Sequence, residues 1–211
     1  MDEGGELTTC VWLYIMVKIN FITAKAPRWE GFWRIRGREV HTMLKLVKLE
    51  ETYMPQLVNM MDEWSASGER IVPYVLTKAD YHRYQDYVES LEVISEGNGL
   101  VPDSTYFCLD DDRDMFLGAV NIRHKLNEKL LLNGGHIGDG IRPSERGKGY
   151  GTRMIALALE KCRELGIDRV LMVCDRNNAA SARTIVKNGG VMENEIEVDG
   201  VVEQRYWIDI R

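Results

Sequence analysis

The chain has neither an excess of basic residues nor a cluster of metal ligands. Its 27 Lys and Arg residues are outnumbered by 33 Asp and Glu residues, which gives a formal net charge of -6. Nucleic-acid-binding surfaces are normally basic, so we expect no nucleic-acid partner. The acidic composition suits cationic substrates such as amines, and it equally suits a protein that is acidic for solubility.

Cysteine and histidine are also scarce, with 4 of each. Cys10, Cys108, Cys162 and Cys174 show no CxxC or other metal-type spacing, and the histidines are scattered, so no metal site is expected. The last three cysteines fall in apolar segments with strand or helix periodicity. We therefore predict buried free thiols in a reducing compartment, which indicates a cytoplasmic protein.

A long hydrophobic run is absent as well. Residues 10–22 are apolar but interrupted, and they fall short of the ~20 residues that span a bilayer. Their length suits the core of a signal peptide, but Asp2, Glu3 and Glu6 precede them, where a secretory signal carries positive charge. We interpret residues 1–42 as an N-terminal extension outside the core fold and expect no membrane association. An amphipathic membrane anchor is the alternative.

The most informative stretch is residues 142–151, Arg-Pro-Ser-Glu-Arg-Gly-Lys-Gly-Tyr-Gly. Its three alternate glycines allow backbone conformations that a side chain would forbid, and they let the main chain approach a ligand closely. A helical pattern begins at Tyr150, and the N–H groups of a first helical turn have no partner within the helix. With Arg146 and Lys148 beside them, these groups form a cradle suited to a pyrophosphate.

Two common phosphate-binding loops do not fit this stretch. The Gly-Lys-Ser/Thr ending of a Walker A loop is missing. The glycines lack the spacing of the dinucleotide fingerprint, and nothing near the front of the chain looks like a Rossmann βαβ unit.

The segments around the loop follow a strand, helix, strand, helix order. An apolar run at 135–141 leads into the loop, and an apolar helical face continues from it until Gly166 ends the helix. Residues 168–174 are typical of a buried strand, and an Asn-headed helix then runs to the glycines at 189–190.

This order, together with the pattern Arg-x-x-Gly-x-Gly at residues 146–151, resembles the GCN5-related N-acetyltransferase (GNAT) family. The resemblance covers residues 44–211 and implies one domain at residues 43–211. It implies an α/β (α+β) fold with a mixed, mostly antiparallel central sheet of about seven strands and about four flanking helices. It also implies acetyl-CoA as co-substrate, with no metal.

The remaining elements follow from periodicity. We expect the order β, α, α, β, β, β, α, β, α, β, β, with a type I′ turn at Asp199-Gly200 in the last hairpin. The segments outside the loop region are a strand at 44–49, helices at 51–64 and 79–94, a helical turn at 125–132, and hairpins at 105–123 and 191–211.

The GNAT resemblance also implies roles for residues on both sides of the loop. The strand before the loop and the strand after the first helix splay apart around the cofactor. Main-chain groups of Gly140, Ile141 and Arg142 would then pair with the pantetheine arm, and Asn178 with Ser181 would approach from the second helix. The implied pyrophosphate-binding residues are Arg146, Gly147, Lys148, Gly149, Tyr150, Gly151 and Thr152.

Direct transfer to a neutral amine requires a base for the ammonium group and a group that stabilises the leaving thiolate. His136 and Asp139, on the strand that enters the loop, are the candidate bases, and each also has a structural interpretation at a sheet edge or surface. Ile185 stands where many GNAT enzymes carry a thiol-protonating Tyr. Water, Tyr206 or the helix N-terminus would then protonate or stabilise the leaving thiolate.

Three functions stay open. The first is an N-acetyltransferase that transfers an acetyl or other acyl group from acyl-CoA to a primary amine of a small molecule or peptide. The second is a non-catalytic CoA- or acyl-CoA-binding regulatory module, which the missing Tyr keeps open. The third is a nucleotide-binding phosphate loop, which lacks the Mg²⁺-ligating Ser or Thr. The sequence does not name the acceptor, and it leaves a homodimer open.

Overall fold

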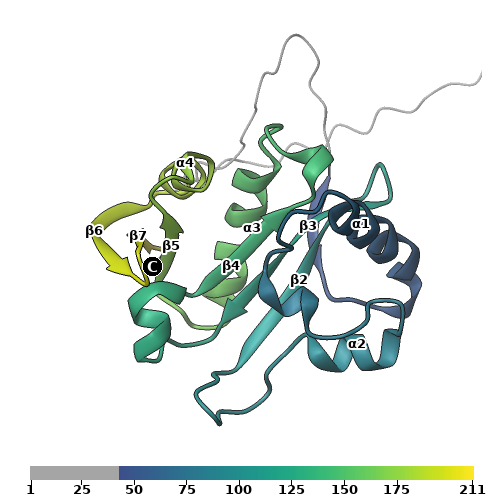
Figure 1. Cartoon of the computed structure of the whole chain (residues 1–211), viewed down its shortest axis with the longest axis horizontal. Helices are drawn as coiled ribbons and strands as arrows, with labels where there is room; N and C mark the ends of the chain where they lie inside the picture. The colour runs from purple at the N-terminus through teal and green to yellow at the C-terminus, as the bar shows by residue number, and fades with distance from the viewer. Residues whose placement is uncertain (1–42) are drawn as a thin grey trace, which may run out of the picture. The chain divides into compact units, whose positions relative to one another are not determined.

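The computed structural model describes residues 43–211, so the interpretation of residues 1–42 and of Cys10 falls outside the described residues. The described chain has seven β-strands and four α-helices in the order predicted from the sequence (Figure 1). The strands are β1 (Leu44–Val47), β2 (Asp103–Asp110), β3 (Met115–Arg123), β4 (Ile137–Ile141), β5 (Arg169–Asp175), β6 (Val191–Val198) and β7 (Val201–Asp209). The α-helices are α1 (Met54–Ala66), α2 (Tyr84–Ser90), α3 (Tyr150–Glu164) and α4 (Ala179–Lys187).

The strands form two antiparallel sheets. The first has the order β1-β2-β3-β4 and the second the order β5-β7-β6. The β2–β3 hairpin is the predicted one, and its strands are largely buried on both faces because helices cover both faces of this sheet. The β6–β7 hairpin turns at Asp199 and Gly200, whose φ values of 51° and 80° confirm the type I′ turn.

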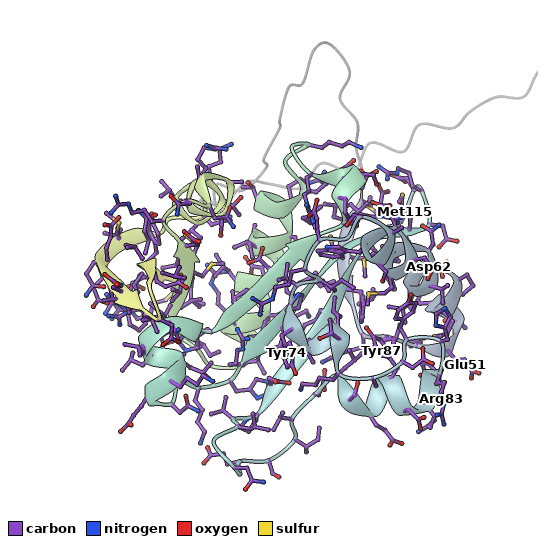
Figure 2. The ribbon with its side chains drawn as sticks, viewed as in Figure 1. Glu51, Asp62, Tyr74, Arg83, Tyr87 and Met115 are labelled. Carbon is purple, nitrogen blue, oxygen red and sulfur yellow. The ribbon has the colours of Figure 1, made fainter. Side chains whose placement is uncertain are left out.

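Two hydrophobic clusters lie on opposite faces of the first sheet. On one face, Met154, Ile155 and Ala158 of α3 pack against β3, β5 and β7. On the other face, α1 and α2 pack against Phe107 and Phe116, as Figure 1 shows for the helices. The side chains that contribute most from these helices are Leu57, Met60, Met61, Trp64 and Tyr87. Tyr87, labelled in Figure 2, is fully buried, and its hydroxyl donates to the carbonyl of Leu76 at 3.1 Å.

The helix expected at 79–94 spans only Tyr84–Ser90 in the structure, and a turn accounts for the loss of its first residues. A side-chain oxygen of Asp80 accepts the main-chain N–H of His82 at 3.0 Å, and the Asp80 carbonyl accepts that of Arg83 at 3.0 Å. Asp favours such local bonds over helix. The helix therefore begins only at Tyr84. The helical turn expected at 125–132 is a short π-helix, Leu130–Gly134.

Cys108, Cys162 and Cys174 are buried free thiols, as predicted. Within the described part of the chain, no three or more His, Cys, Asp or Glu side chains gather where they could hold a metal ion. No helix of residues 43–211 is both long and apolar enough to cross a membrane.

Candidate active site

The site lies where the two sheets meet and then separate. The main-chain N–H of His136 donates to the Leu171 carbonyl at 2.7 Å, and the N–H of Leu171 donates to Nδ1 of His136 at 2.9 Å. Beyond this point β4 pairs only with β3 and β5 pairs only with β7 among the described strands. The edge of β4 that faces β5 is therefore open, and Figure 1 shows the two strands as neighbours in separate sheets.

Main-chain direction decides which groups reach this open edge. The His136 carbonyl accepts from Arg123 N–H at 2.8 Å, and the Arg142 N–H donates to the Leu117 carbonyl at 2.9 Å, so these even-numbered positions bond toward β3. Successive residues of a strand direct their N–H and C=O groups to opposite sides. The main-chain groups of Asp139 and Ile141 therefore point toward β5.

A pocket of about 580 Å³ opens between the loop, the end of β4 and α4. Its lining includes every cofactor residue implied by the sequence except Arg142 and Lys148. Asp139 also lines it, whereas His136 does not. The lining residues are Glu69, Arg70, Val72, Asp139, Gly140, Ile141, Glu145, Arg146, Gly147, Gly149, Tyr150, Gly151, Thr152, Asn178, Ala180, Ser181, Arg183, Thr184 and Lys187.

The loop at the pocket wall has the geometry of an anion cradle. Gly147 and Gly149 adopt φ values of 74° and 85°, in the left-handed region that side chains disfavour. Gly149 is the N-cap of α3, and no side chain caps the helix there. Within residues 43–211, the N–H groups of Gly147, Lys148 and Gly149 donate to no protein acceptor. They and the first turn of α3 are available to an anion.

The basic side chains of the loop, in contrast, are already paired. Arg146 forms an ion pair with Glu69, and its Nε donates to the Ile141 carbonyl at 2.9 Å. Lys148 lies 3.2 Å from Glu145, which also pairs with Arg113 at 2.8 Å. Burial raises the pKa of Glu145, but hydrogen bonds from Arg113 and Lys148 outweigh it and hold that pKa below its usual value. The cradle's attraction for anions therefore comes mainly from the backbone.

Arg142 is engaged on the other side of the sheet. Its Nε donates to Glu63 of α1 at 2.6 Å, and its two terminal nitrogens donate to the carbonyls of Phe116 and Asn59, each at 3.2 Å. Its side chain is only 4% exposed. Its main-chain N–H also donates to the Leu117 carbonyl. Arg142 therefore connects α1 to the end of β4, and it does not line the pocket.

The two candidate bases occupy different environments. His136 is 7% exposed, and burial, with a smaller effect of the Arg123 charge, lowers its pKa to about 4. Its Nδ1 already accepts a hydrogen bond, so this imidazole is neutral at pH 7 and serves the junction with Leu171. Asp139 is half-buried in the pocket wall, and burial raises its pKa to about 6 although Arg123 opposes the shift.

The start of α4 carries the residues expected there. Asn178 is the N-cap, and its side-chain oxygen accepts the Ser181 N–H at 3.0 Å. Ile185 is fully buried in the core, on the side of α4 turned away from the pocket. The Tyr206 hydroxyl donates to Gln204 at 2.8 Å, and Tyr206 does not line the pocket.

Four further pocket residues on α4 were not expected from the sequence. They recur at helical spacing after Asn178, and this spacing is the signal that would have found them. These residues are Ala180, Arg183, Thr184 and Lys187.

Comparison with known proteins agrees with this arrangement. A family model described as an acetyltransferase (GNAT) domain matches residues 44–191. The chain belongs to the GNAT acetyltransferase family. No curated protein sequence is significantly similar to the chain.

Solved structures show the same fold at low sequence identity. A ribosomal L7/L12 alpha-N-protein acetyltransferase, RimL, in complex with coenzyme A is 17% identical, with a TM-score of 0.58 over 81% of this chain and 96% of that one. A GNAT-family acetyltransferase from Bacillus anthracis is 18% identical, with a TM-score of 0.54 over 79% and 94%. The self-immunity acetyltransferase for microcin C7, MccE, in complex with acetyl-CoA and AMP is 19% identical, with a TM-score of 0.52 over 79% and 92%.

Proposed function

We propose that this GNAT domain is an N-acetyltransferase that transfers the acetyl group of acetyl-CoA directly to a primary amine of a small molecule or peptide. The observation that carries the proposal is a single pocket that joins an unpaired row of loop N–H groups to the carboxyl of Asp139. One end suits a pyrophosphate and the other suits proton transfer.

Binding begins at the loop. The N–H groups from Gly147 into the first turn of α3 hold the pyrophosphate, and the pocket then leads along the open edge of β4. There the main-chain groups of Asp139 and the N–H of Ile141 pair with the amides of the pantetheine arm as an added strand would, while the Ile141 carbonyl keeps its bond from Arg146. This places the thioester beside Asp139, between β4 and β5.

Asp139 is the base in this proposal. A carboxyl with a pKa of about 6 is ionised at pH 7 and still basic enough to take a proton from an ammonium group. His136 is the weaker candidate because it lies outside the pocket lining and its Nδ1 is occupied by Leu171. With Ile185 in place of a phenol, the leaving thiolate is protonated by water or stabilised by main-chain N–H groups.

The acceptor is an amine whose identity stays open. Structures with this fold include mutant forms of the spermidine/spermine N-acetyltransferase SpeG from Vibrio cholerae as well as the ribosomal-protein acetyltransferase. A polyamine, an aminoglycoside, an amino acid and a peptide N-terminus are therefore the compounds to test. The second candidate function, a CoA-binding module without turnover, is favoured by one observation, the buried Ile185.

Calorimetric titration with acetyl-CoA, followed by free-thiol release over that panel of amines, separates the candidates. Binding with amine-dependent thiol release supports the transferase, and binding without release over the whole panel supports the regulatory module. Selective binding of ATP would contradict both.

A further inference from the structure

Arg123 places a half-buried cation at the point where the two sheets separate. It is the last residue of β3, and its side chain crosses the start of β4. A Cβ at Gly138 would lie 3.1 and 3.2 Å from the two terminal nitrogens of Arg123, so the guanidinium lies directly over this glycine. Its Nη1 reaches the Gly134 carbonyl, and the next residue, Gly135, lies against Leu171 of β5. The cation is therefore close to the gap between β4 and β5.

No carboxylate of the described chain neutralises Arg123. Asp103 stands directly opposite it on β2, but Oδ1 of Asp103 accepts the Val93 N–H at 3.0 Å. Within residues 43–211, the guanidinium makes one long hydrogen bond, from Nη1 to the Gly134 carbonyl at 3.4 Å. Burial lowers the pKa of Arg123, and the charges of Asp103 and Asp139 oppose the shift without a hydrogen bond to either. Desolvated charges in proteins normally have a partner, so this environment suits the binding of an anion.

Asp139 provides the opposite charge on the other face of the same strand. Successive side chains of a strand point to opposite faces. Ile137, on the face of Asp139, packs in the cluster with α3, whereas a Cβ at Gly140, on the face of Gly138, would contact α1. Arg123 and Asp139 influence each other's pKa but form no ion pair. Because no described strand closes this edge of β4, a ligand there can reach both faces.

The anion that fits Arg123 is not a phosphate of CoA. The loop N–H groups lie beyond the Ile141 end of β4, whereas Arg123 lies over the Ile137 end. At ~3.3 Å per residue, these ends of the strand are ~13 Å apart. Arg123 also lies across β4 from the pocket lining. An anion beside Arg123 therefore belongs to the acceptor, which approaches the thioester from the α1 face.

We propose that Arg123 binds a carboxylate of the acceptor, and that the preferred acceptors are amino acids whose ammonium group lies beside Asp139. The proposal rests on the proposed acetyl transfer in this pocket. A guanidinium holds a carboxylate by two parallel, charge-assisted bonds. The ammonium group gives one proton to Asp139, and its nitrogen forms the amide bond as the C–S bond of the thioester breaks. The nitrogen loses its second proton, the thiolate leaves as the free thiol, and the carboxylate on Arg123 is unchanged.

Free-thiol release with matched acceptors tests this in the full chain. L-Leucine and L-phenylalanine are compared with their amides, which lack the carboxylate, and with phenethylamine. Wild-type kcat/KM is expected to be about 10- to 100-fold higher for the acids, the usual size of a hydrogen-bonded charge contact. The amides are the more readily deprotonated amines, so amine basicity would favour them and cannot produce this preference.

Arg123→Gln is expected to remove most of the preference by lowering kcat/KM for the acids alone, and Arg123→Lys to retain part of it. Because Arg123→Gln removes a desolvated charge and one long hydrogen bond, its Tm should not fall below that of the wild type. Arg83→Gln is the matched control. Arg83, labelled in Figure 2, is exposed at the start of α2 and pairs with Asp86 at 2.6 Å, so its loss should leave the preference unchanged.

The outcomes separate this proposal from the proposed function. Turnover of amides or simple amines at rates equal to those of the acids would overturn the carboxylate site and leave the acetyltransferase intact. A preference for acids that persists in Arg123→Gln would overturn the assignment of Arg123. Should Arg123→Gln fail to fold, the wild-type preference and its reduction in Arg123→Lys decide the same question. If no amine of any kind released thiol, the proposed function would itself fail.

Discussion

Leu171 N–H donates to Nδ1 of His136 at 2.9 Å, and His136 N–H donates to the Leu171 carbonyl at 2.7 Å. The imidazole thus replaces one bond of a strand ladder at the point where β4 and β5 begin to separate. A main-chain N–H that is buried where strand pairing ends needs another acceptor, because an unpaired buried donor costs free energy. Nδ1 of His136 is that acceptor here, and the open edge beyond it forms one wall of the pocket.

His136→Ala is expected to destabilise the protein more than it affects the chemistry. The change leaves the buried N–H of Leu171 without an acceptor, which costs about 1–3 kcal/mol. For a domain of this size, that lowers Tm by roughly 3–10 °C. His136→Asn, whose side-chain oxygen can accept the same bond, is the control and should melt closer to the wild type. If both variants melted like the wild type, the hydrogen bond would have no structural importance.

The same histidine makes the fold sensitive to acid. Its native pKa of about 4 lies below the ordinary 6.5, so its contribution to stability is complete above pH 6.5 and is lost as the pH falls through 4. The shift corresponds to on the order of 3 kcal/mol. Asp139 acts in the opposite sense: its native pKa of about 6 exceeds the ordinary 3.8, so its contribution is present below pH 3.8 and is lost as the pH rises through 6.

Urea unfolding at pH 7.5, 6 and 4.5 measures these two effects. The free energy of unfolding of His136→Asn should fall less between pH 7.5 and 4.5 than that of the wild type. That of Asp139→Asn should exceed the wild-type value at pH 7.5, because a desolvated charge has been removed. A parallel pH dependence in all three proteins would contradict both assignments.

At the loop, Gly149→Val should weaken acetyl-CoA binding by more than tenfold, and Lys148→Ala by less than about threefold. A β-branched residue does not adopt the φ of 85° at Gly149, and Lys148 is already paired with Glu145. Gly166→Val is the control, because Gly166 has a similar φ of 75° but lies at the far end of α3. It should lower Tm without lowering affinity. Equal and small losses in calorimetry for the two loop variants would argue against a backbone cradle.

A chain that begins at Met43 is expected to fold and to bind CoA like the full chain. β1 starts at Leu44 and pairs with β2, and the family match also begins at residue 44. Tm within a few degrees of the full-length value and an unchanged affinity for CoA would support the assignment of residues 1–42 to an extension. An insoluble truncated protein would show that the extension contributes to the core.

The parts of the site that were predictable from the sequence are those set by local conformation. The positive-φ glycines of the loop and the Asn178 N-cap depend on residues within a few positions, so the pattern alone located them. His136 and Arg142 were harder because their partners, Leu171 and Glu63, lie 35 and 79 residues away. Nothing in the local sequence reveals such pairings.

The partners of the basic side chains at the loop also depend on the fold. The sequence places Arg146 and Lys148 beside the cradle, and the structure adds that each forms an ion pair, with Glu69 and Glu145 respectively. The α4 cation Arg183, in contrast, could have been found from helical spacing once Asn178 was placed. Helix periodicity predicts which further residues of a helix share the face of a known site residue. Ion pairs between residues far apart in the sequence can be identified only from the structure.

The pH dependence of kcat/KM for acetyl transfer, in the wild type and in Asp139→Asn, tests the account most directly. With a base of pKa about 6, wild-type kcat/KM should fall as the pH drops below 6, separately from any limb at higher pH set by the substrate amine. Asp139→Asn should lose that lower limb and at least ~100-fold in rate while binding acetyl-CoA as tightly as the wild type. Full activity in Asp139→Asn with an unchanged pH profile would contradict the assignment of Asp139 as the base.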